Sequence, residues 1–148
     1  MSFPSLTITK DSLRPEGEFA QAQAQFLYPQ SEDVKILNSL LKKYRIGVVS
    51  HFYMDAELQG ILSACEYEHI HIADSLFMAD RAVQMAEAGV QSIVVLGVDF
   101  MSENVRAVVD AAGYSHIPVY RVDHREIGCS LAESAEARAY GAWLDQAK

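Results

Sequence analysis

The residue with the clearest chemical potential is Cys129, which lies in the segment Ile-Gly-Cys-Ser-Leu-Ala-Glu at 127–133. Ser130 and Glu133 are three residues apart, a spacing typical of the capping box that opens a helix. The thiol is therefore expected one residue before a helix N-terminus, where free backbone N–H groups and the helix dipole favour a thiolate. A thiolate there suits nucleophilic chemistry or iron ligation. The alternative is an unreactive, small hydrophobic side chain at a turn.

Further polar and aromatic side chains follow each of four short apolar segments that we expect to be strands. In chain order these residues are His51, Phe52 and Tyr53; Asp74 and Ser75; Gly97, Asp99, Phe100 and Met101; and Asp123, His124 and Cys129. Ligands bind beyond the carboxyl ends of the strands in an open parallel sheet. Imidazole, phenol, hydroxyl and thiol groups are therefore expected at one edge of the sheet.

The strand-end residues also have purely structural interpretations. His51 could satisfy backbone groups, and the Tyr53 ring could pack with its hydroxyl in water. Asp74 and Ser75 could form only a helix N-cap, which is the commoner role of such a pair. Asp99 could likewise begin a helix.

Other residue types point to packing rather than chemistry. Phe100 and Met101 belong to types that more often lie in a core than against a ligand. His69 and His71 share one face of a strand, and partial exposure is favoured there over metal binding. Cys65 lies on the apolar side of an expected helix and is assigned to the core.

The elements that must position these residues alternate along the chain. Helices are expected at 19–26, 31–44, 55–66, 75–87, 102–112 and 130–146, and strands at 46–50, 69–73, 92–97 and 117–121. Alternating strands and helices indicate βαβ units with a parallel sheet. The predicted fold class is α/β: residues 31–148 form a three-layer αβα domain with a four-stranded parallel sheet, and residues 1–30 form an N-terminal helical extension. The helix starts at Ser75, Ser102 and Ser130 would offer N–H groups to an anion.

Composition narrows the class of partner. The 148 residues carry a formal net charge of −8, which argues against nucleic acid and anionic membrane as partners. Two cysteines make no disulfide framework and indicate a reducing compartment. The opening Met-Ser-Phe-Pro has neither a basic nor an apolar segment, so no signal or transit peptide is expected there. Dinucleotide, Walker A, zinc and nucleophile-elbow motifs are absent from the sequence.

The strand-end segments together resemble the quinolinate synthase family, also called NadA. The matching segments, in the family's order, are 48–53, 74–76, 97–103 and 128–132. The resemblance extends from about Phe19 to the C-terminus. The residues at 54–60 and 98–104 look most like those of the plant-type, plastid branch of the family.

The resemblance implies both a reaction and a set of site residues. The family condenses iminoaspartate with dihydroxyacetone phosphate to form quinolinate in NAD biosynthesis, and its three αβα domains surround a [4Fe–4S] cluster. Each domain supplies one cysteine, so Cys129 would be the metal ligand here. His51 and Tyr53 match the acid/base residues beside the substrate, and Ser75 matches a serine that holds a substrate carboxylate. Phe100 and Met101 complete the expected substrate-binding set.

The chain departs from the family in length, because the family continues for two more domains. We therefore expect the first domain of a longer enzyme, inactive and prone to self-association when isolated, with an incomplete set of cluster ligands. The expected compartment is the cytoplasm, or the plastid stroma for a plant-type enzyme. The alternative is a non-catalytic αβα binding module for a small phosphorylated or dicarboxylate ligand.

Overall fold

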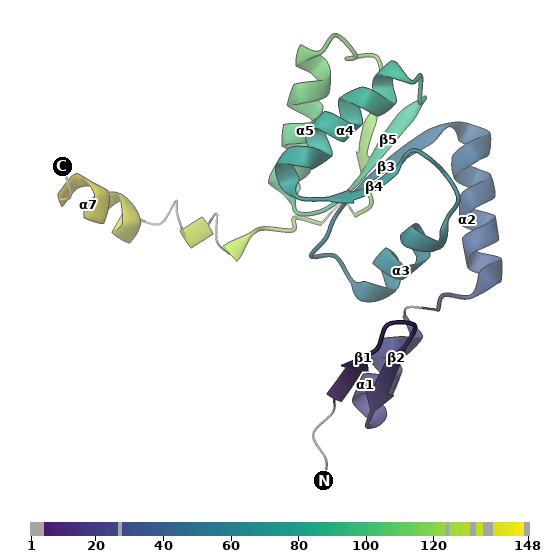
Figure 1. Cartoon of the computed structure of the whole chain (residues 1–148). Helices are drawn as coiled ribbons and strands as arrows, with labels where there is room; N and C mark the ends of the chain where they lie inside the picture. Colours follow the sequence, from purple (N-terminus) through teal and green to yellow (C-terminus); the bar gives the residue numbers. More distant parts are fainter. Residues whose placement is uncertain (1–4, 27, 124, 131–132, 135–137, 147–148) are drawn as a thin grey trace.

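A four-stranded parallel sheet forms the centre of the molecule in the computed structural model, which describes residues 5–26, 28–123, 125–130, 133–134 and 138–146 (Figure 1). Its order is β4 (Ile70–Ala73), β3 (Ile46–His51), β5 (Ser92–Leu96) and β6 (Val119–Arg121). Val49 of β3 pairs with His71 on one side and with Val95 on the other. The predicted parallel sheet is confirmed.

Helices cover both faces of this sheet. Figure 1 shows α2 (Ser31–Tyr44) and α3 (Ala56–Ala64) on one face, with α4 (Ser75–Glu87) and α5 (Asp99–Ala111) on the other. Successive strand residues point to opposite faces, so neighbouring residues of β3 enter different cores. Val48 packs with Leu41 and Leu62 of the α2–α3 layer. Val49 packs in the core of the α4–α5 layer, which confirms the three-layer αβα fold.

One close contact fixes the start of α5 against the end of β5. A Cβ added at Gly97 would lie 2.8 Å from the Met101 sulfur, a distance that real side chains do not adopt. The absence of a side chain at Gly97 therefore allows Met101 to pack directly over the strand end. Met101 is buried as a result.

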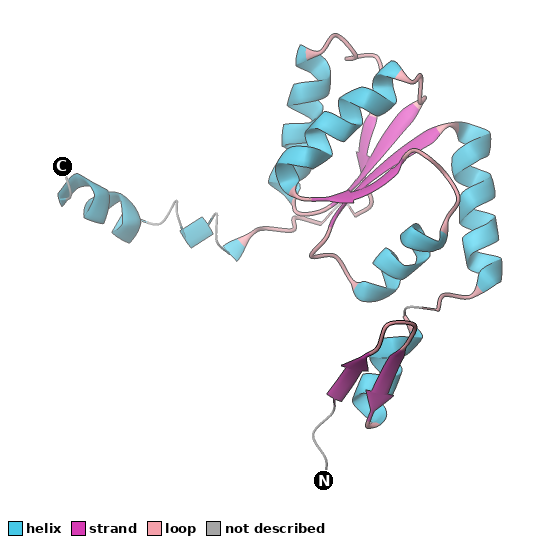
Figure 2. Cartoon of the chain, viewed as in Figure 1, coloured by secondary structure: helices cyan, strands magenta, loops and turns pink. Residues whose placement is uncertain are grey.

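The N-terminal extension differs from the helical prediction. Helix α1 (Glu18–Gln25) lies where a helix was expected, but β1 (Ser5–Ile8) and β2 (Leu13–Glu16) precede it as an antiparallel hairpin (Figure 2). A turn closes the hairpin, because the Thr9 and Ser12 backbones and hydroxyls bond one another. Strands of four residues give too short an alternation to be recognised from sequence. The boundary at residue 30 remains a prediction.

Several element boundaries also differ. Helix α5 begins at Asp99 and not at Ser102, whereas α2 has the expected span. Cys65 follows the last residue of α3 and is partly exposed, so it does not lie on the helix face as expected. Of the expected helix at 130–146, the structure describes α7 (Arg138–Gln146), and residues 131–132 and 135–137 lie outside the described part. Among the described residues, every helix is too short or too polar to cross a bilayer.

Candidate functional site at the carboxyl edge of the sheet

The sheet order places a reversal point between β3 and β5. These strands are neighbours, yet the helix that follows β3 covers one face of the sheet and the helix that follows β5 covers the other. Their connections therefore diverge at the carboxyl edge. Such a point is where open α/β sheets bind ligands. His51 ends β3, and Asp99 begins the helix after β5, so both lie at this point.

His51 is buried, with 6% of its surface exposed. Its Nδ1 accepts a hydrogen bond of 3.3 Å from the Tyr53 backbone N–H. A neutral imidazole that accepts at Nδ1 carries its proton on Nε2. The local backbone therefore assigns the tautomer and leaves Nε2–H as the donor available for chemistry.

Tyr53 has the opposite environment, because 82% of its surface is exposed. Its ring lies edge-on to His51 at 4.7 Å and to Phe52 at 4.5 Å between centroids. The Phe52 ring in turn stacks on His51 at 4.6 Å. These three consecutive rings form one cluster with a buried imidazole and an exposed phenol.

Gln59 of α3 holds the backbone of the same turn. Its side-chain amide donates to the carbonyl oxygens of Phe52, at 2.8 Å, and of Met54, at 2.6 Å. The Met54 amide also donates to the His51 carbonyl at 3.0 Å. The side-chain bonds of the turn at 51–54 thus come from residues close in sequence, and the Phe52 amide also donates to the Ala73 carbonyl of β4 at 3.2 Å.

At the end of β4, Asp74 has the structural role considered above. Its Oδ1 accepts from the amides of Leu76 and Phe77, both at 2.9 Å, and so caps α4. Ser75 is the first residue of α4 and is partly exposed. The Ser75 hydroxyl therefore lies at the carboxyl edge, beside a helix start where Asp74 occupies two of the donors.

At the end of β5, the two predicted substrate-binding residues separate. Phe100 is 43% exposed, whereas the Met101 side chain lies in the core. Ser102 is buried in the first turn of α5, and its hydroxyl donates to the Asp99 carbonyl at 2.7 Å. Ser102 therefore does not begin a helix and offers no anion site, contrary to expectation.

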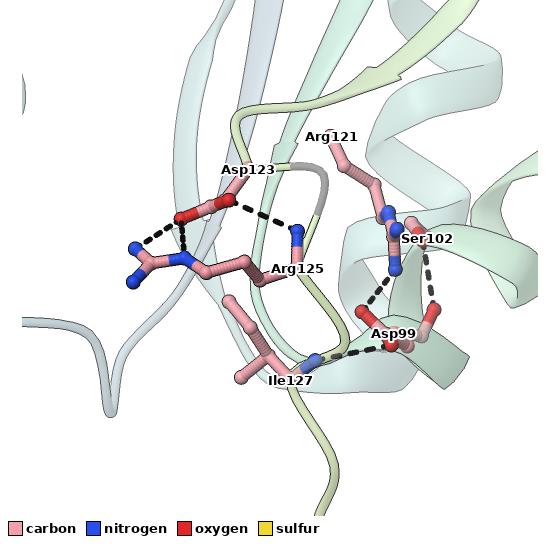
Figure 3. A network of polar contacts seen from close by, with 6 residues as sticks. All are labelled: Asp99, Ser102, Arg121, Asp123, Arg125 and Ile127. Atoms are coloured by element: carbon pink, nitrogen blue, oxygen red, sulfur yellow. Dashed lines mark hydrogen bonds and ion pairs between the residues drawn. The ribbon is translucent and has the colours of Figure 1, made fainter.

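The segment after β6 is held by carboxylates (Figure 3). Asp99 forms an ion pair with Arg121, the last residue of β6, and accepts a hydrogen bond from the Ile127 amide at 3.1 Å. Asp123 accepts from the Arg125 side chain at 2.8 Å and from its amide at 3.0 Å. His124 lies outside the described residues.

Cys129 is partly exposed and lies at the start of a helical turn. The Glu133 amide donates to the Cys129 carbonyl at 2.9 Å, and the Ser134 hydroxyl donates to the Ser130 carbonyl at 2.6 Å. Cys129 therefore lies one residue before the first helical residue, Ser130, as expected, and its own carbonyl accepts the first helical bond. The neighbouring Leu131 and Ala132 lie outside the described residues.

The two thiols differ in their surroundings. Burial raises the pKa of Cys65, although the positive charge of Lys42 acts in the opposite direction. The Cys65 thiol also lies 3.8 Å from the Val34 carbonyl, to which it donates. These contacts favour a protonated, unreactive Cys65, as expected of a structural cysteine.

The donor set for a metal is small. In the part of the chain that the structure describes, no group of three or more His, Cys, Asp or Glu side chains could hold a metal ion. Cys129 could supply one ligand, since it is partly exposed and lies two residues after Ile127, which bonds Asp99. These residues fit an iron–sulfur cluster only as one ligand of several.

The edge as a whole is an open surface. Phe52, Tyr53, Phe100 and Ile127 are all more than two-fifths exposed. A groove that the structure does describe lies elsewhere, against the N-terminal extension, where Leu6 and Phe19 line it. The exposed side chains that follow the strands therefore lie on an open surface.

Sequence reasoning missed three residues that shape this site, namely Gln59, Arg121 and the Asp99 side chain as a link between segments. Gln59 has no sequence signal, because its partners are backbone carbonyls. Asp99 was identified only as a strand-end residue and a possible helix start. Its two side-chain partners are 22 and 28 residues further along the chain, so only the folded arrangement shows them.

Comparisons with known proteins agree with these observations. The family model described as quinolinate synthetase A protein matches residues 35–148. Chloroplastic quinolinate synthases are 56% identical in Nicotiana tabacum and 54% identical in Arabidopsis thaliana, each over 147 residues and 98% of this chain. The chain spans about a fifth of the length of these plant relatives, 20% in each case. The chain belongs to the quinolinate synthase (NadA) family.

Proposed function

We propose that this chain is the first αβα domain of a quinolinate synthase, which condenses iminoaspartate with dihydroxyacetone phosphate to form quinolinate for NAD biosynthesis. The observation that carries the proposal is the family match over residues 35–148, in a fold where His51 ends β3 and Ser75 begins the helix after the neighbouring strand β4. The other two domains would be its partners and would close the open edge.

The proposed roles follow from the environment of each side chain. His51 presents Nε2–H from a fixed tautomer, and the exposed Tyr53 can bring its phenol to a substrate, so both suit acid/base work. Ser75 would bind a substrate carboxylate through its hydroxyl at the start of α4. Phe100 would contact the substrate with its exposed ring, and Met101 would support that contact from the core.

Cys129 would hold one iron of a [4Fe–4S] cluster, with the remaining ligands supplied from outside these residues. When bound, such a cluster with one open iron position supplies Lewis-acid polarisation of a hydroxyl or carbonyl group.

The proposed compartment is the plastid stroma, because the plant relatives are named chloroplastic. The cytoplasm is the alternative for a relative of the bacterial type. Nucleic acid and membrane are not proposed as partners.

A chimera tests the proposal. These residues would replace the matching segment of the Nicotiana tabacum enzyme, and quinolinate formation and iron content would be measured together. We expect the chimera to retain both, and the 148 residues alone to form no quinolinate. A chimera with normal iron content but no quinolinate would contradict the catalytic role and favour the alternative, a binding module for a small phosphorylated or dicarboxylate ligand.

A further inference from the structure

We infer that Asp99 is a positioning residue that fixes the segment carrying Cys129 against the start of α5. Its relevance to cluster binding rests on the proposed function, whereas the positioning itself does not. Asp99 would touch neither substrate nor cluster in this role, and it would act only through the backbone at Ile127.

Two hydrogen bonds run in opposite directions between Asp99 and Ile127. The Ile127 amide donates to Asp99 Oδ2 at 3.1 Å, and the Asp99 amide donates to the Ile127 carbonyl at 3.0 Å. Both backbone groups of Ile127 are therefore bonded to one residue of another element, and Figure 3 shows the bond from the Ile127 amide. The N–H and C=O of Ile127 belong to the two peptide planes on either side of its Cα, so both planes are restrained.

The start of α5 explains why this contact forms. The first amides of a helix have no partner within the helix, and the Ile127 carbonyl satisfies the one at Asp99. A carboxylate in the first turn is also stabilised by the helix dipole. The other carboxylate oxygen pairs with Arg121 of β6, which orients Asp99 for the Ile127 amide.

The restraint on Ile127 also limits where the Cys129 thiol can lie, because the two residues are close in the chain. Cys129 is two residues after Ile127, and two residues span at most about 7 Å. Asp123 and Arg125 bond each other within the same segment, so that pair shapes the segment, whereas Asp99 links it to α5. Positioning of Cys129 therefore depends on Asp99 more than on the charges nearer to it in sequence.

Thiol labelling of the 148-residue chain tests the inference, with Cys65 as an internal reference. In Asp99→Ala we expect alkylation of Cys129 to become about tenfold faster relative to Cys65, a change typical of losing hydrogen bonds to a charged group. The Ile127 amide should exchange its hydrogen faster by a similar factor. Asp110→Ala is the matched control, because it removes the ion pair with Arg106 on the same helix, at its other end.

Two outcomes would overturn the inference. One is an unchanged ratio of Cys129 to Cys65 alkylation rates in Asp99→Ala, and the other is an equal change of this ratio in Asp110→Ala. If Asp99→Ala does not fold, the same ratio is measured in Asp99→Asn. This variant keeps an acceptor for the Ile127 amide and loses the ion pair with Arg121, so relative alkylation of Cys129 should rise about threefold. These readouts use neither iron nor quinolinate. A failure of the proposed function would therefore appear in the chimera alone.

Discussion

Two loops that follow strands of the sheet are held in place by different means. The turn at 51–54 is held by side-chain bonds within eight residues, through the Tyr53 amide on His51 and through Gln59, and by one backbone bond from Phe52 to Ala73 of β4. The segment at 125–130 is held by Asp99, which is 28 residues from Ile127 in the chain. The side chains proposed for acid/base work therefore depend mainly on local side-chain bonds, and the segment of the thiol depends on the assembled fold.

This difference predicts different responses to mutation. Loss of the Gln59 bonds should stay local to the turn at 51–54, because both bonds close within one βα connection. Damage to the segment at 125–130 should follow any change in how β6 and α5 pack. The variants below test that contrast, and the activity measurements use the chimera described above.

The largest effect is expected for Cys129→Ser. Serine is a poor iron ligand, since its hydroxyl is hard and protonated at neutral pH, so iron content and quinolinate formation should both be lost. Cys65→Ser is the matched control and should keep both. Normal iron content in Cys129→Ser would remove Cys129 from the ligand set.

Tyr53→Phe should reduce turnover by about two to four powers of ten while iron content stays normal. The ring contacts with His51 and Phe52 are kept, and only the phenolic proton is removed. Tyr44→Phe, on the exposed surface of α2, is the control and should leave turnover unchanged. Near-normal turnover in Tyr53→Phe would leave His51 as the main acid/base candidate.

Gln59→Ala should loosen the turn at 51–54 and lower the free energy of unfolding by about 1–2 kcal/mol, because two backbone carbonyls lose their partner. Urea unfolding measures the loss in the free energy of unfolding, and faster hydrogen exchange at the Tyr53 and Met54 amides would show which backbone groups are loosened. Gln91→Ala removes a single, longer bond to the Gly89 carbonyl and should cost less. Faster exchange at Ile127 in Gln59→Ala would contradict the independence of the two loops.

The smallest expected effect is the pH dependence of stability that is caused by His71 of β4. Burial lowers the pKa of His71, and the positive charges of Arg81 and of protonated His69 act in the same direction. Glu68 lies 3.8 Å from His69, measured between its Oε1 and the His69 Nε2. The unfolded state therefore binds the proton more readily than the folded state.

The sign of the pH effect follows from that difference. Above the ordinary pKa of 6.5 His71 is neutral in both states, and stability falls as pH drops through 6.5 toward the lowered value. His71→Gln should flatten this part of the curve, as measured by urea unfolding between about pH 7.5 and 5. An unchanged slope would show that other groups cause it.

Much of the fold could be predicted because its signals are local. The apolar run at 92–96 and the glycine after α4, with a φ of 85° at Gly89, mark a buried strand and a helix end by composition alone. The hairpin at 5–16 was missed, because four-residue strands leave too little alternation to detect.

The site could be predicted only in its residue types. Parallel topology brings strand ends together wherever they occur in the chain, so His51, Ser75 and Cys129 were identified from their places after strands. The bonds that orient them were not, because a glutamine on a helix or an aspartate after a strand has no preferred partner until the tertiary structure forms. Met101 shows the same limit, since its burial depends on the missing side chain of Gly97.

The long separation between Asp99 and Ile127 also sets the order in which the site can assemble during folding. Contacts within the turn at 51–54 can close as soon as α3 forms, whereas Ile127 must wait until β5, α5 and β6 are in register. Parallel pairings of this kind form slowly, because the intervening chain must be ordered first. On a chain synthesised from its N-terminus, Cys129 is thus expected to be the last of the proposed site residues to take its place.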